Sequence, residues 1–224
     1  MRFFVAILFI VSSSLSSAQA QNIQLFTPRS TSQDHVLLYD GSYLDTPYSW
    51  GVYSNVVREP LQLTTNSGEI AAVESLFSLD LLFATKLAQR WDLGVRLPVT
   101  VNQVLSSQFS NIDGGFGLGD VAVHAKTRLF TIADAWNVEW IPELLLPTGD
   151  SAKLRGDNTL GAATTVAANR KWHQWRIALN AGAHFRLDET ALANLRVRHQ
   201  LRLGAALAHA FNNKITLGVE LTSL

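Results

Sequence analysis

The chain has 224 residues, of which 47% are hydrophobic and 16% charged, and its formal net charge at pH 7 is zero. This length allows one barrel or sandwich or at most two small domains, and the composition excludes a disordered chain. The sequence contains no cysteine, which excludes disulfides and thiolate sites, and the neutral charge without a basic run argues against nucleic acid as a partner.

Residues 1–20 have the order of a secretory signal peptide. Arg2 precedes an apolar run from Phe3 to Val11, and the small residues AQA supply a cleavage site before Gln21. A membrane anchor is the alternative, but a spanning helix needs about 20 apolar residues and this run is far shorter. We therefore expect an exported protein that begins with an irregular N-terminal lead-in at residues 21–47.

From residue 48 onward, segments in which apolar and polar residues alternate fill the chain. In RWDLGVRLPVTV, residues 90–101, the alternation has no break, so a strand there has one apolar and one polar face. The segment SLFSLDLLFATKLAQRW fits a helix almost as well, but its neighbours favour a strand. We expect nine strands, at Tyr48–Val57, Val73–Leu87, Trp91–Gln103, Leu118–Phe130, Trp136–Leu146, Thr159–Ala168, Trp175–Leu187, Arg196–Ala210 and Lys214–Leu224.

Short and long connections alternate strictly between these strands. The short ones are Ala88–Arg90, Thr131–Ala135, Asn169–Gln174 and Phe211–Asn213. The long ones are Arg58–Ala72, Val104–Gly117, Pro147–Asn158 and Asp188–Leu195. An up-and-down meander with tight turns at one end produces this layout, which outer-membrane barrels have and a soluble barrel would share.

Aromatic residues gather at the short turns. They are Trp91, Phe130, Trp136, Trp172, Trp175 and Phe211. Membrane barrels carry aromatic girdles at the headgroup level, whereas the general aromatic preference of strands does not explain a collection at one end. With export and long strands, this favours lipid on the apolar face. The predicted fold is therefore an all-β, antiparallel, up-and-down transmembrane β-barrel.

On this assignment the polar faces carry thirteen charged residues into the lumen. They are Glu74, Asp80, Arg96, Asp120, Lys126, Arg128, Glu139, Glu143, Arg176, Arg186, Arg198, Arg202 and Glu220. Because the signs are mixed, these side chains either pair and close the lumen as a structural core or stay hydrated and line a pore. We favour the paired interior.

The number of strands is odd, whereas a closed bacterial barrel needs an even number. The sequence also ends at GVELTSL, directly after a strand. We therefore expect the barrel at residues 48–224 to be truncated at its C-terminus, with about 10–12 strands in the complete protein.

Three groups of sequence segments carry a family resemblance. They are NIDGGFGLGDVAVHAKTRLF at Asn111–Phe130, WIPELLLPTGD at Trp140–Asp150, and the turn-strand phrases QRWDLGVRLPV and NNKITLGVEL. Together they resemble the N-terminal barrel region of OmpA-family outer-membrane proteins, and are similar to outer-membrane transport barrels of the phenol-degradation (MetA-pathway) type. The resemblance covers Tyr48 to Leu224. It implies an outer-membrane barrel, often followed by a peptidoglycan-binding domain, which this chain does not contain.

The sequence carries few signs of catalytic or metal-binding chemistry. Acidic residues gather at the long-loop end, at Asp113, Asp120, Asp150 and Asp157. Calcium would accept such ligands, but turn chemistry is the simpler explanation. His124 and His184 fall on the lumen face, where a hydrolase site is conceivable, yet no G-x-S-x-G motif is present. We expect no enzyme activity, no cofactor and no metal.

The sequence thus predicts a structural, membrane-anchoring barrel of a longer OmpA-like protein in the Gram-negative outer membrane. Its expected partners are outer-membrane lipid and, through a domain absent from this chain, peptidoglycan. Two alternatives stay open. One is a passive channel or transporter for small or apolar solutes, and the other is a soluble periplasmic ligand-binding barrel.

Overall fold

The computed structural model describes most of the region after residue 45 and a few residues before it. The described residues are 28–29, 38–39, 44, 46–65, 68–88, 90–105, 114–133, 135–157, 159–187, 190–192, 195–197, 199–211 and 216–223. Within this part of the chain, no helix is long and apolar enough to cross a membrane.

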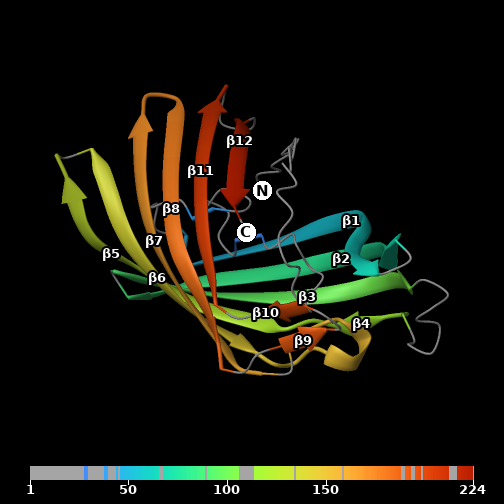
Figure 1. Ribbon diagram of the computed structural model, residues 1–224. Coiled ribbons are helices and arrows are strands. Elements are labelled where there is room, and N and C mark those ends of the chain that lie inside the picture. Colours follow the sequence, from blue (N-terminus) through green and yellow to red (C-terminus); the bar gives the residue numbers. More distant parts are fainter. Residues whose placement is uncertain are drawn as a thin grey trace.

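One antiparallel sheet forms the body of the protein (Figure 1). Its strands are β1 (Tyr48–Thr65), β2 (Gly68–Ala88), β3 (Trp91–Leu105), β4 (Gly117–Leu118), β5 (Val121–Ile132), β6 (Trp136–Leu146), β7 (Gly161–Trp172), β8 (Trp175–Arg186), β11 (Gln200–Ala210) and β12 (Thr216–Ser223). Apart from β4, which pairs with β3, they follow one another in chain order from β1 to β12. Each of the nine predicted strands has a counterpart in this sheet, and the meander is up-and-down as expected. The predicted strand Arg196–Ala210 begins only at Gln200, because residues 195–197 pair in a separate hairpin.

The sheet curls into a half-barrel with β1 and β12 at its two edges (Figure 1). A second, small hairpin joins β9 (Thr190–Leu192) to β10 (Leu195–Val197) inside one of the predicted long connections. A 3₁₀ helix, η2 (Ser151–Lys153), lies inside another. The long connections therefore carry structure of their own at one end of the meander.

The predicted long connection Arg58–Ala72 is wrong. Strands β1 and β2 continue as one hairpin until Thr65 pairs with Gly68. The segment looks like a loop in the sequence because Glu59 and Pro60 interrupt the alternation. Glu59 has a φ of 49°, and the register shifts between Arg58 and Leu61. An edge strand tolerates a proline at such an irregularity, so the pairing resumes beyond it.

The two faces of the sheet differ in the way the sequence predicted. In β3 the set that contains the polar residues is buried, namely Asp92, Gly94, Arg96, Pro98 and Thr100. The apolar set that starts at Trp91 is only half-buried on the opposite face. Large apolar side chains are likewise exposed along β1, β2, β8, β11 and β12. The protein is thus inside-out, with polar residues in the concave interior and apolar residues on the convex surface.

Candidate functional site

The concave face carries most of the charged residues that the sequence assigned to the lumen. The buried ones are Asp80, Arg96, Asp120, Lys126, Glu139, Glu143 and Arg186. The half-buried ones are Arg128, Arg176, Arg202 and Glu220. Glu74 is exposed, because the register between β2 and β3 shifts next to it and places Val73 on the buried side instead. The assignment of Glu74 to the lumen is therefore wrong, and Arg198 lies outside the described residues.

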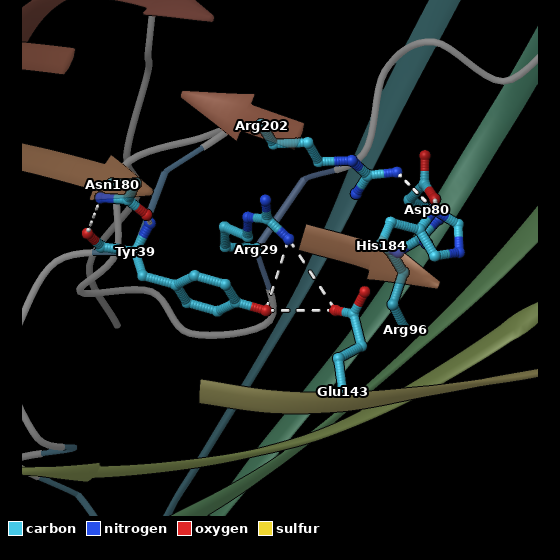
Figure 2. A network of polar contacts seen from close by, with 8 residues as sticks. All are labelled: Arg29, Tyr39, Asp80, Arg96, Glu143, Asn180, His184 and Arg202. Atoms are coloured by element: carbon cyan, nitrogen blue, oxygen red, sulfur yellow. Dashed lines mark hydrogen bonds and ion pairs between the residues drawn. The ribbon is translucent and has the colours of Figure 1, made fainter. Parts of the chain in front are cut away.

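Opposite charges on the concave face pair across neighbouring strands. Arg96 on β3 lies 3.5 Å from Asp80 on β2. Both residues are labelled in Figure 2. Arg128 on β5 lies 3.9 Å from Glu139 on β6. Because an unpaired buried charge is strongly destabilising, these pairs make a narrow polar interior possible. The predicted closure of the lumen by such pairs stays a prediction.

Part of the N-terminal lead-in lies inside the half-barrel, which the sequence did not predict. The backbone N–H of Tyr39 donates to Oδ1 of Asn180 at 3.0 Å, and Nδ2 of Asn180 donates to the Tyr39 carbonyl at 3.1 Å. The backbone N–H of Leu44 donates to the Asp92 carboxylate at 3.0 Å. Leu38 packs against small residues of β8 and β11. Inward side chains of three strands thus hold a segment that has no periodic pattern.

The side chain of Tyr39 reaches the wall formed by β6 (Figure 2). Its hydroxyl donates to Oε2 of Glu143 at 3.2 Å. Arg29, also from the lead-in, donates to the same hydroxyl at 3.3 Å and lies 3.8 Å from the Glu143 carboxylate. Nearby, Nη2 of Arg202 lies 3.1 Å from Nδ1 of His184, and Figure 2 labels both residues. Hydrogen-bonding groups of both charge signs therefore lie close together in this interior.

The GLGD and LPTGD motifs meet at the end of the half-barrel where the long connections lie. The buried Asp120 carboxylate accepts hydrogen bonds from the backbone N–H groups of Gly149 at 2.9 Å and Asp157 at 2.6 Å. The hydroxyl of Thr148 donates to the Gly119 carbonyl at 2.9 Å. Burial raises the pKa of Asp120 above its usual value, and the two backbone hydrogen bonds oppose that shift. The two motifs therefore form one structural joint.

Arg155 ties a further loop to this joint. Its guanidinium donates to the carbonyl oxygens of Gly115 at 2.8 Å and Phe116 at 2.9 Å. On the other side, Arg186 of β8 pairs with the Asp157 carboxylate at 2.7 Å. Arg155 could not be predicted from the sequence, because it lies in a connection without periodicity and its partners here are backbone carbonyls.

The acidic residues at this end act as hydrogen-bond acceptors for the loops. Asp150 caps η2 by accepting from the Ala152 N–H at 3.1 Å, and Asp113 lies outside the described residues. In the part of the chain that the structure describes, no three His, Cys, Asp or Glu residues are grouped to hold a metal ion. His124 makes an edge contact with the ring of Tyr39, with centroids 5.3 Å apart. These contacts favour turn chemistry over calcium, and they make His124 part of the lumen lining.

The predicted aromatic girdle lies at the short-turn end. Trp172 and Trp175 pair opposite each other where β7 turns into β8. The rings of Trp175 and His209 are 4.5 Å apart, and those of His209 and Phe211 are 4.6 Å apart. Phe130, Trp172, Trp175 and Phe211 are exposed, and Trp91 and Trp136 are half-buried. Their position at the headgroup level stays a prediction.

Comparison with known proteins agrees with this architecture. The family model described as "Putative MetA-pathway of phenol degradation" matches residues 83–223. Among solved structures, an outer membrane channel from Pseudomonas putida F1 is similar, with a TM-score of 0.59 and 18% identity over 82% of this chain and 74% of the channel. At 18% identity, this structural similarity establishes the fold alone. No curated protein matches the chain. The family match supports the resemblance to transport barrels of the phenol-degradation type. It does not support the resemblance to OmpA-family proteins.

Proposed function

The chain belongs to the MetA-pathway phenol-degradation family, and we propose that it forms a passive channel for small solutes in the Gram-negative outer membrane. The observation that carries this proposal is the inside-out half-barrel, whose fold is similar to that of an outer membrane channel. Charged and polar side chains line its concave face, and apolar side chains cover its convex face. Such a wall suits lipid outside and polar contact inside.

The exposed apolar face is the reason to prefer a membrane barrel over a soluble ligand-binding barrel. Leu179 on β8, Leu207 on β11 and Val219 on β12 are 48%, 46% and 59% exposed, and they belong to a continuous set on adjacent strands. Soluble monomers rarely expose apolar patches larger than a few hundred square ångströms. Lipid, with export by the predicted signal peptide, accounts for this surface directly.

A channel also fits better than the structural, membrane-anchoring role. The anchoring role followed from the OmpA resemblance, which the family match does not support, whereas the family and the fold both agree with transport. Outer-membrane lipid is the partner that this function requires. A link to peptidoglycan would need a domain outside this chain and stays a prediction.

The test is conductance of the full chain in a planar lipid bilayer. Folded protein is first identified by a gel mobility that changes on boiling, as expected of an intact barrel. We expect discrete conductance steps from this protein and none from the same preparation after boiling. Folded protein that inserts without any conductance would contradict the channel and favour a closed structural barrel.

Ion selectivity provides a second, residue-level test. Glu143 is a buried carboxylate of the concave face, so Glu143→Gln should shift the reversal potential in a salt gradient toward anion selectivity. Glu74→Gln removes the same charge from an exposed position next to the β2 irregularity and serves as the matched control. Equal effects of the two substitutions would show that the concave face does not line the conduction path.

A further inference from the structure

Arg170 is a cation on the convex, largely apolar face of β7. On this strand Ala167 and Asn169 are buried in the concave interior. Val166 and Trp172 are exposed on the other side. Because side chains alternate along a strand, Arg170 shares the outward face with Val166 and Trp172. An outward arginine is strongly destabilising at the middle of a bilayer and costs little at its interface.

Aromatic side chains surround Arg170 at the short-turn end of the meander. In the register of β6 and β7 it lies opposite Trp136, and Trp172 is two residues further along the same face. Trp172 in turn lies opposite Trp175 of β8. Tryptophan rings prefer the headgroup level of a membrane. The arginine is therefore placed at the level where lipid phosphates lie.

A hollow of about 300 Å³ lies on the same convex face, further from the short turns. Strands β7, β8 and β11, which neighbour one another in the sheet (Figure 1), form it. Its outward-facing residues are Thr164, Val166, Ala181, Ala183, Leu201 and Leu203. In the register each alanine of β8 lies between a larger residue of β7 and a leucine of β11. The two alanines therefore form the floor of the hollow.

The hollow is apolar although a threonine lines it. The Thr164 hydroxyl accepts a hydrogen bond from Nε1 of Trp140 on β6 at 2.8 Å, so it has a partner within the protein. Leu201 and Leu203 are exposed and form the opposite wall. Such a surface suits a hydrocarbon chain.

The hollow and the arginine are spaced so that one lipid molecule can reach both. Val166 and Thr164 precede Arg170 by four and six residues on one face of β7. At about 3.3 Å per residue this is about 13–20 Å along the strand. With a strand tilt of about 45°, the hollow lies roughly 9–14 Å deeper in the membrane than the arginine. Half of a hydrocarbon core of about 30 Å covers this depth.

We propose that β7, β8 and β11 bind one anionic phospholipid of the leaflet at the short-turn end, with its phosphate on Arg170 and an acyl chain in the hollow. The proposal goes beyond the channel function and rests on the membrane location that this function assumes. A guanidinium can donate two parallel hydrogen bonds to a phosphate. The residues that face Arg170 in the register, Trp136 and Ile177, carry no charge. Charge complementarity therefore favours a headgroup with net negative charge, such as that of phosphatidylglycerol.

The test measures lipid association by electron paramagnetic resonance. The full chain is reconstituted in phosphatidylcholine vesicles that contain a trace of chain-spin-labelled phosphatidylglycerol or phosphatidylcholine, and its folding is checked by the boiling-dependent gel shift. From the immobilised fraction of each label, we expect wild type to prefer phosphatidylglycerol roughly fivefold, the effect of one arginine at an anionic lipid surface. Arg170→Gln should remove this preference. Lys171→Gln, which removes a charge from the adjacent, inward-facing position, should keep it.

A second pair of variants tests the hollow. Ala181→Leu fills its floor and should lower the immobilised fraction of phosphatidylglycerol to that of phosphatidylcholine. Ala125→Leu adds the same apolar volume to the outward face of β5, where Ala125 lies opposite Leu93, and should leave the preference unchanged.

Equal association of the two labelled lipids with wild-type protein would overturn the proposal without any variant. Equal losses in Arg170→Gln and Lys171→Gln would also overturn it, because surface charge alone would then explain the preference. So would equal effects of Ala181→Leu and Ala125→Leu. A folded, conducting barrel without lipid preference would refute this site and leave the proposed function intact. Protein that does not enter the vesicles would overturn the membrane location and the lipid site together.

Discussion

Replacing Asp120 by alanine tests whether the two glycine-rich motifs form a structural joint. The buried carboxylate accepts hydrogen bonds from the backbone N–H groups of Gly149 and Asp157. Hydrogen bonds to a charged group contribute about 1.5–3 kcal/mol each, so two of them give about 3–6 kcal/mol. The cost of burying the carboxylate, visible in its raised pKa, offsets part of this sum. We expect Asp120→Ala to lower the free energy of unfolding by roughly 3 kcal/mol.

The assay is urea unfolding of the detergent-folded protein, followed by tryptophan fluorescence and by the boiling-dependent gel shift. Asp150→Ala is the control, because Asp150 is an exposed carboxylate in the same loop that only caps a short 3₁₀ helix. Loss of such a cap costs about 0.5–2 kcal/mol. If both substitutions lowered the stability by the same amount, Asp120 would be an ordinary turn residue and the reasoning about the joint would be refuted.

Four further substitutions or conditions give measurable outcomes. Leu179→Arg on the convex face should cost about 2–4 kcal/mol of folding free energy in lipid vesicles; an undiminished folding yield would contradict lipid contact there. Arg186→Leu removes the partner of a buried carboxylate, so the urea midpoint should fall by the equivalent of about 3–5 kcal/mol; an unchanged midpoint would count against the pair. Gly156→Ala places a Cβ against the Asp120 carboxylate and should destabilise by about 1–3 kcal/mol, whereas Gly51→Ala, whose nearest atoms lie 3.8 Å away, should not. The folded-state pKa of Asp120 lies above its ordinary 3.8. Its protonation therefore stabilises the folded protein fully at pH values below 3.8, and this contribution is lost as the pH rises through the folded-state pKa. Asp120→Asn should remove this part of the pH dependence of the free energy of unfolding.

The strand pattern could be read from the sequence because alternation along a strand determines which side chains share a face. All nine predicted strands have counterparts in the sheet, with shifted ends, and in β3 the face that carries Arg96 is buried as predicted. The failures lie where the period is broken locally. At Glu74 a register shift reverses the faces, and at Pro60 an edge-strand irregularity looks like a loop. Neither depends on residue type strongly enough for a single sequence to reveal it.

The interior was harder to predict than the wall. Charges such as Arg96 and Glu143 could be assigned to the lumen from their strand positions alone. Arg29, Tyr39 and Arg155 could not, because they lie in segments without periodicity and their partners are distant in sequence. Tyr39 and Asn180, for example, are joined by two hydrogen bonds across 141 positions. Only folding brings such pairs together, and no short motif records them.

The lead-in and the wall both contribute to the charge balance of the interior. Arg96 and Asp80 neutralise each other within the wall, as do Arg128 and Glu139, so these pairs persist whether or not the lead-in is in place. Glu143 draws its positive neighbours from both, because Arg29 of the lead-in lies 3.8 Å from its carboxylate and the wall residues Arg96 and Arg202 act on the same charge. The buried carboxylate of β6 is therefore balanced by cations that come from distant parts of the chain.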